Sequence, residues 1–220
     1  MAHTLHGLGI GTDDAVAIVM DNHPDYLATM FASSKIGAVN SFINTGLRGK
    51  SLAHCIAVCK AKAMVVTSEL VHILEDLLPQ LQADNVKILV KGSKVPAWAI
   101  SYDQVAASKP TTEAPEWREL RKSCAFLSTF SLVYTSGTTG MPKAAIVTHG
   151  RVYTAGVVVV VNYDYTQDDV AFLVLPMFHG NALQSSFAAF LAGAKIVLKP
   201  KFSVKTTMQD ISVHGCTIFQ

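Results

Sequence analysis

Short apolar runs with the length of β-strands alternate along this chain with segments that have helical signals. In the first half of the chain the runs occupy residues 15–20, 39–43, 63–67 and 86–90. A run that is apolar at nearly every position indicates a strand buried on both faces, which is typical of parallel sheets. Parallel strands need crossover connections, and the intervening helices supply them. The sequence therefore predicts an α/β fold of parallel sheets with helices packed on their faces.

The segments between these runs carry the helix signals. Pro24 suits the first turn of a helix that we expect to end near Ile36. Ser51 and Ser68 are expected to cap the next two helices, and the second of these has a core-facing apolar stripe. The stripe consists of Leu70, Ile73, Leu74, Leu77, Leu78 and Leu81. In the second half of the chain we expect helices at 151–161, 183–192 and 203–214, and strands at 170–175, 194–198 and 216–219.

Residues 91–123 interrupt this alternation. The stretch is polar and contains Pro96, Pro110 and Pro115. Proline fixes one backbone angle and removes a hydrogen-bond donor, so it disfavours the interior of helices and strands. We therefore predict a long surface connection with little regular structure over 91–123.

The segment that follows, residues 134–143, has the composition of a phosphate-binding loop. It reads Tyr134, Thr135, Ser136, Gly137, Thr138, Thr139, Gly140, Met141, Pro142 and Lys143. Apolar runs enter and leave it, which indicates a strand, a loop and a second strand. Glycine permits positive φ, consecutive N–H groups can form an anion-binding nest, and hydroxyls and a lysine add donors and charge. An ordinary connecting loop without a ligand is the alternative.

Two other nucleotide motifs fit the sequence less well. A Walker A loop needs Gly-Lys-Ser/Thr in direct succession, but Met141 and Pro142 separate Gly140 from Lys143, which disfavours a P-loop NTPase. A dinucleotide fingerprint follows a strand, whereas the glycines at positions 7, 9 and 11 precede the first one.

Composition narrows the classes of function. With 50% hydrophobic and 15% charged residues, the chain is globular and not disordered. Its net charge of +2 gives no electrostatic case for binding nucleic acid. No run reaches the ~18 apolar residues of a membrane span, and the first residues lack the zones of a signal peptide. The cysteines form no Cys-x-x-Cys pair, so we expect buried free thiols in place of a metal site.

A second motif lies at residues 175–181, which read Leu-Pro-Met-Phe-His-Gly-Asn. A proline ends the preceding strand, so Phe178 and His179 follow its carboxyl end, where α/β proteins form ligand sites. From the residues alone, a structural aromatic ring beside a solvated histidine is an equal alternative. We assign His149 a structural role, and His54 and His72 surface or packing roles.

At the phosphate loop the chain resembles the adenylate-forming superfamily, which includes acyl-CoA synthetases, luciferases and peptide-synthetase adenylation domains. Residues 43–48, 52–55, 143–149, 201–203 and 216–220 are similar to very-long-chain acyl-CoA synthetases, also called fatty acid transport proteins. The resemblance extends from about Gly11 to Gln220. It implies that residues 1–220 form part of the large N-terminal AMP-binding domain.

This resemblance also implies a reaction: ATP-dependent adenylation of a long-chain or very-long-chain fatty acid, then thioester formation with CoA, linked to fatty acid uptake. Phe178 and His179 would line the acyl or adenylate pocket, although Phe178 stands where relatives usually have Tyr. Thr138 and Lys143 are the best candidates for a catalytic role. The residues that would bind the nucleotide phosphates are Tyr134, Thr135, Ser136, Gly137, Thr138, Thr139, Gly140 and Lys143.

Other parts of the family pattern do not occur in this sequence. The family's Tyr-Gly-x-Thr-Glu segment, which stacks adenine and places the Mg²⁺ ligand, is not found, and neither is the C-terminal domain with its catalytic lysine. We therefore expect an incomplete N-terminal domain that does not complete adenylation alone, and we assign no metal ligand. The alternatives are a fragment of an aryl or amino-acid adenylating enzyme, and a non-catalytic remnant or interaction module.

The resemblance has a last implication, which concerns location. Relatives act at the surface of the endoplasmic reticulum, plasma or peroxisomal membrane. Peripheral membrane association is therefore expected. Acyl chain length and oligomeric state stay open.

Overall fold

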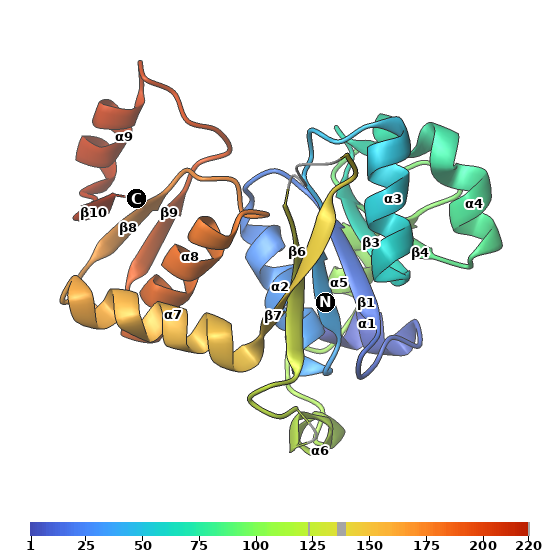
Figure 1. Cartoon of the computed structure of the whole chain (residues 1–220), viewed down its shortest axis with the longest axis horizontal. Coiled ribbons are helices and arrows are strands. Elements are labelled where there is room, and N and C mark those ends of the chain that lie inside the picture. The colour runs from blue at the N-terminus through green and yellow to red at the C-terminus, as the bar shows by residue number, and fades with distance from the viewer. Residues whose placement is uncertain (123, 136–139, 220) are drawn as a thin grey trace.

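The structure is a computed structural model, and it describes the chain apart from residue 123, residues 136–139 and residue 220. The described residues form two β-sheets that lie side by side, each with helices packed against it (Figure 1). The strand order is β5-β4-β3-β1-β2-β6-β7 in the larger sheet and β10-β8-β9 in the smaller one. The predicted α/β fold is confirmed.

The strands of the larger sheet come from the first two thirds of the chain. They are β1 (Ala15–Val19), β2 (Val39–Phe42), β3 (Ala61–Thr67), β4 (Lys87–Lys91), β5 (Ile100–Ser101), β6 (Thr129–Thr135) and β7 (Lys143–Thr148). The smaller sheet contains β8 (Val170–Leu173), β9 (Lys195–Leu198) and β10 (Ile218–Phe219).

The helices alternate with these strands. They are α1 (Ala2–Gly7), α2 (Pro24–Lys35), α3 (Gly49–Cys59), the 3₁₀ helix η1 (Val71–Leu77), α4 (Leu78–Ala83), α5 (Tyr102–Ala107), α6 (Glu116–Lys122), α7 (His149–Asn162), α8 (Gly180–Ala192) and α9 (Thr207–His214). The helix expected at 151–161 is confirmed despite its β-branched valines, whereas the last helix begins at Thr207 and not at Ser203.

Strand β1 lies at the centre of the larger sheet and is buried along its whole length. Val16 and Ile18 belong to the apolar core on one face of the sheet, while Ala17 and Val19 belong to the core on the other face. Successive side chains of a strand point to opposite faces, so a strand covered on both sides must be apolar at every position. This explains the uninterrupted apolar run of the sequence.

Of the strand pairings formed by the described residues, β6 with β7 is antiparallel and the others are parallel. The short connection between these two strands accounts for this, because a crossover helix needs about a dozen residues or more. The hairpin therefore places the predicted phosphate loop at the carboxyl end of β6, on the last two strands of the sheet.

The smaller sheet is covered by the helix pair α7 and α8 (Figure 1). Gly156 of α7 allows these helices to approach closely, since an added Cβ would lie 2.9 Å from Leu191 and 3.1 Å from Phe187. Phe187 also packs against Phe31 of α2 and Phe130 of β6, at 5.7 and 5.4 Å between ring centroids. Aromatic packing thus joins the smaller sheet's helices to the larger sheet.

Both predicted serine caps were wrong. Helix α3 begins at Gly49 with Arg48 as its N-cap, so Ser51 lies inside the helix. After β3 the chain forms the 3₁₀ helix η1, capped by Leu70 and not Ser68, and then the separate helix α4. Pro79 explains the break, because proline has no N–H and is tolerated only in the first turn of a helix.

The expectation of little regular structure in 91–123 was also wrong, because the stretch contains β5, α5 and α6. The Ser101 side chain accepts a hydrogen bond from the Gln104 amide and caps α5. Tyr102 and Trp117 are both buried in the core beside the first two helices. These two aromatic side chains fix the short helices to the rest of the molecule.

Candidate functional site

The β6–β7 hairpin brings the two ends of the phosphate loop together. Thr135 pairs with Lys143, and Tyr134 pairs with Ala144. Gly140 has φ = +130°, a conformation that side-chain-bearing residues rarely adopt, so glycine is required there. The predicted phosphate-binding residues Ser136, Gly137, Thr138 and Thr139 lie outside the described residues. The exposed Lys143 side chain is therefore the cationic group at the described edge of the loop.

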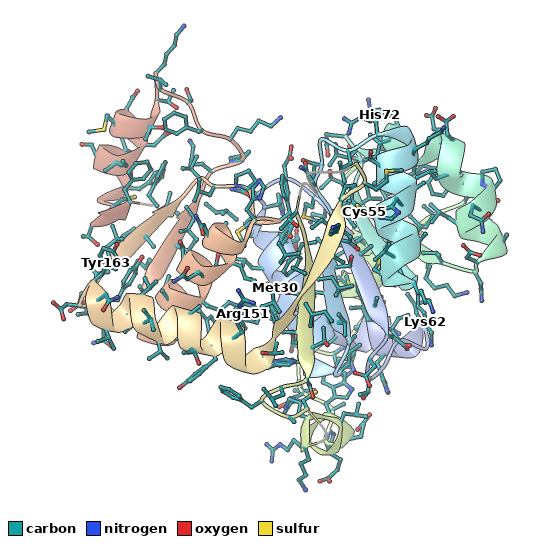
Figure 2. All side chains as sticks on the ribbon, viewed as in Figure 1. Met30, Cys55, Lys62, His72, Arg151 and Tyr163 are labelled. Carbon is teal, nitrogen blue, oxygen red and sulfur yellow. The ribbon has the colours of Figure 1, made fainter. Side chains whose placement is uncertain are left out.

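Tyr134 anchors the entry to the loop. Its hydroxyl donates to the Cys55 carbonyl oxygen of α3 at 2.8 Å and lies 3.0 Å from the Ser41 hydroxyl of β2. Burial, followed by the nearby Cys59 thiol, raises the pKa of Tyr134 far above its usual range. The phenol therefore stays protonated and holds the hairpin against α3, next to Cys55 (Figure 2).

His54 anchors the exit from the loop. Its Nε2 lies 3.0 Å from the Pro142 carbonyl oxygen, and in the Nε2–H tautomer it donates to that oxygen. One turn earlier on α3, Ser51 lies 3.9 Å from the Met141 sulfur. The sequence interpretation left His54 as a surface or packing residue. The signal that it missed is helical spacing, because positions 51, 54 and 55 share one face of α3.

The second motif follows the carboxyl end of β8, and its two ring residues have different environments. Phe178 is buried, whereas His179 is exposed and lies just before α8 as its N-cap residue. Their rings are 4.6 Å apart between centroids. Phe178 lines a pocket between the two sheets, and His179 lines a separate depression with Leu175 and Asn181. The structure therefore does not place both predicted residues in one pocket.

The pocket that contains Phe178 opens at the carboxyl ends of β1, β2 and β8. Its cationic side chains are Arg48 and Lys201, and its acidic one is Asp21, whose carboxylate accepts a hydrogen bond from Thr45 at 2.7 Å. The Lys201 ammonium is 3.7 Å from Asp21. The remaining lining residues are Asn22, Gly46, Leu70, Val174, Leu175, Pro176, Pro200 and Phe202. Cationic and aromatic groups at this edge of the sheets suit a phosphorylated ligand.

Asn22 holds the wall of this pocket together. It follows β1, is buried, and donates from Nδ2 to the carbonyl oxygens of Leu175 at 2.9 Å and Lys199 at 3.0 Å. Its Oδ1 accepts the Met177 amide at 2.8 Å. One side chain of the larger sheet thereby fixes the segment that carries Phe178, and no sequence pattern had singled it out.

The cysteine and histidine predictions have clear structural outcomes. Cys55 and Cys59 are buried free thiols, as expected, whereas Cys124 and Cys216 are free but only half-buried. Burial, together with the neighbouring Cys59, raises the pKa of Cys55 to about 11. His149 packs its ring edge against Phe130 at 5.3 Å between centroids, which fits a structural role.

Within the described part of the chain, no three His, Cys, Asp or Glu side chains are grouped so that they could hold a metal ion. None of the helices described is both long and apolar enough to cross a bilayer.

Comparison with known proteins places these features in a family. The chain is 33% identical over 208 residues to long-chain fatty acid transport protein 6 of Homo sapiens, an alignment that covers 94% of this chain and 33% of that protein. The chain thus spans about a third of the length of this curated relative.

Solved structures agree on the fold. A putative long-chain-fatty-acid CoA ligase from Rhodopseudomonas palustris superposes with a TM-score of 0.87 at 24% identity, over 99% of this chain and 52% of that one. An anthranilate CoA ligase in complex with anthranoyl-AMP gives the same TM-score and identity, over 99% of this chain and 42% of its own.

The sequence profile of the AMP-binding enzyme family matches residues 1–220, the whole of this sequence. The predicted resemblance is therefore confirmed: the chain belongs to the AMP-binding enzyme family, within the adenylate-forming superfamily, and its relatives include long-chain fatty acid transport proteins.

Proposed function

We propose that this chain binds ATP and takes part in fatty acid–CoA ligation, in which a fatty acid is adenylated and then transferred to CoA. The observation that carries this is the phosphate loop on its antiparallel hairpin, in a chain of the AMP-binding enzyme family. The reaction requires a group that stabilises the negative charge developing on the departing pyrophosphate. Lys143 and the loop amides and hydroxyls, including those of Ser136 and Thr138, would supply it.

We assign the pocket at Phe178 to a phosphorylated part of one of the two nucleotide substrates, ATP or CoA. Arg48 and Lys201 would bind phosphate, and the Phe178 ring would pack on an apolar or aromatic portion. His179 would face the reacting groups from the start of α8. The long-chain fatty acid is proposed from the names of the relatives, which also support association with a membrane surface.

In such a reaction, bound Mg²⁺ would supply positive charge that offsets the negative charge of the ATP phosphates. The described residues offer no group of three or more His, Cys, Asp or Glu side chains that could hold the ion.

Nucleotide binding tests the proposal directly. Titration of this chain with ATP should show saturable binding, and Lys143→Ala should weaken it by roughly tenfold or more, as expected for losing a charged hydrogen bond. Lys122→Ala is the matched control, because Lys122 is an exposed lysine of α6 paired with Glu119. Equal losses in both variants, or no ATP binding at all, would refute the assignment of the loop.

ATP–pyrophosphate exchange, with and without a long-chain fatty acid, addresses the second part of the proposal. We expect this polypeptide to bind nucleotide without robust exchange. Fatty-acid-dependent exchange at a substantial rate would show instead that these residues complete adenylation alone.

A further inference from the structure

The connection between β9 and α9 projects from the smaller sheet and carries exposed apolar side chains. In Figure 1 it rises at the upper left, and its tip stands clear of the other elements. Phe202 is 57% exposed, Val204 82% and Met208, in the first turn of α9, 74%. We call residues 199–208 the projecting loop. Side chains of this size are not normally gathered at a protruding tip without a partner.

The same loop is cationic. Residues 199–208 contain Lys199, Lys201 and Lys205 and no Asp or Glu, in a chain whose net charge is only +2. Lys199 pairs with Asp210 at 2.9 Å, and Lys201, whose side chain is 80% exposed, pairs with Asp21 at 3.7 Å. Lys205 is exposed and forms no ion pair with any residue that the structure describes. Lys205 is therefore available to an anionic partner, whereas Lys201 pairs with Asp21 and lines the candidate pocket.

Hydrogen bonds hold the loop in this shape. The Ser203 carbonyl oxygen accepts from the amides of Thr206 and Thr207, at 3.2 and 2.9 Å, and from the Thr207 hydroxyl at 2.7 Å. The Lys199–Asp210 pair and the bond from Asn22 to the Lys199 carbonyl fix its base. A preformed turn loses little conformational entropy on binding.

We propose that the projecting loop is a contact site for an anionic lipid surface. Its apolar side chains would enter the boundary between headgroups and acyl chains, while its lysines would lie among the phosphate groups. Interleaved lysines favour lipid over a protein partner, because the buried centres of protein interfaces are depleted in lysine. The inference deepens the proposed membrane association and rests on it, but it does not depend on the ligase chemistry.

Sedimentation with lipid vesicles tests this site. The chain should bind vesicles that contain phosphatidylserine, bind weakly to vesicles of phosphatidylcholine alone, and dissociate as salt is raised, because salt screens exposed charges. The double substitution Val204→Ser and Met208→Ser should weaken binding by roughly tenfold, and Lys205→Gln should weaken it several-fold on the phosphatidylserine vesicles alone.

The control substitutes two other exposed residues that are far from the loop. Val161 and Tyr163 are 67% and 62% exposed at the end of α7, where Figure 2 labels Tyr163. Val161→Ser with Tyr163→Ser should leave vesicle binding unchanged. Circular dichroism should show that every variant is folded.

Three outcomes would overturn the proposal. The first is an equal loss of vesicle binding in the control variant, and the second is vesicle binding that does not depend on phosphatidylserine. The third is self-association of the chain that the Val204 and Met208 substitutions abolish, because the loop would then bind a second copy of the chain. ATP titration of the same variants separates this failure from failure of the nucleotide site, because the substituted residues do not line the candidate pocket.

Discussion

His149, at the start of α7, shows how a single half-buried ring affects stability. Its half-buried imidazole lies edge-on to Phe130, and burial lowers its pKa from the ordinary value of 6.5 because apolar surroundings disfavour the charged form. Below that value the unfolded chain binds a proton that the folded chain resists. The contribution of His149 to stability is therefore complete above pH 6.5 and is lost as the pH falls through the lowered pKa.

This predicts a pH-dependent difference between the protein and its His149→Gln variant. The free energy of unfolding, measured by urea denaturation, should fall more steeply below pH 6.5 in the unsubstituted chain than in the variant. His72→Gln is the control, since His72 is exposed and hydrogen-bonds only locally, to the Glu69 carbonyl. Parallel curves for the protein and His149→Gln would contradict the assignment.

At the scale of elements, hydrogen bonds on both sides of the loop hold the β6–β7 hairpin against α3. The helix binds the hairpin through Tyr134 before the loop and through His54 after it. Both contacts use backbone carbonyl oxygens as acceptors, so they fix the path of the chain and not only the side chains. The geometry of a phosphate loop depends on that path, since backbone N–H groups are its main donors.

The His54 contact predicts a graded effect on nucleotide binding. His54→Ala should weaken ATP binding several-fold, because the strand leaving the loop loses its tether. His54→Gln keeps an N–H donor at a similar reach and should restore most of the affinity. The test is ATP titration of both variants beside His72→Ala. Equal affinities for His54→Ala and His54→Gln would show that the hydrogen bond has no role.

Some features of these elements could be predicted from the sequence, and others could not. The strands could be predicted because burial on both faces demands apolar residues at every position, as in β1. The break at Pro79 has a local cause that the sequence shows, but the continuous apolar stripe favoured a single helix. The short helices near Tyr102 and Trp117 were missed, because local propensity did not reveal the long-range packing that stabilises them. The loop could be singled out because the family signature that predicts phosphate binding restricts the residue type at each position. His54 and Asn22 were not, because their hydrogen-bond partners are distant in the chain.

At the scale of the whole molecule, Asn22 joins the two sheets. It links the end of β1 to the segments that follow β8 and β9, with all of its side-chain polar atoms engaged. The Asn22→Ala variant would leave the Met177 amide and two carbonyl groups without these partners. An unsatisfied buried group costs about 1–3 kcal/mol. The Met177 amide is buried, but the hydrogen bonds to the two carbonyl groups are part-buried, so access of water reduces their share.

We therefore expect Asn22→Ala to lower the free energy of unfolding by about 3 kcal/mol, measured by urea denaturation. Asn162→Ala provides the comparison, because Asn162 is exposed at the end of α7. A change of less than about 0.5 kcal/mol for Asn22→Ala, the range usual for surface substitutions, would show that the bridge does not stabilise the fold.

Asn22 also connects the projecting loop with the pocket at Phe178. Its Nδ2 group binds both the Lys199 carbonyl, at the base of the projecting loop, and the Leu175 carbonyl, three residues before Phe178. Pro200, Lys201 and Phe202 of the loop also line that pocket, so the loop and the pocket wall are joined both directly and through this amide group. Insertion of Val204 and Met208 into a bilayer would displace the loop and strain these hydrogen bonds. The shape of the candidate pocket would then depend on whether the loop is bound to a membrane.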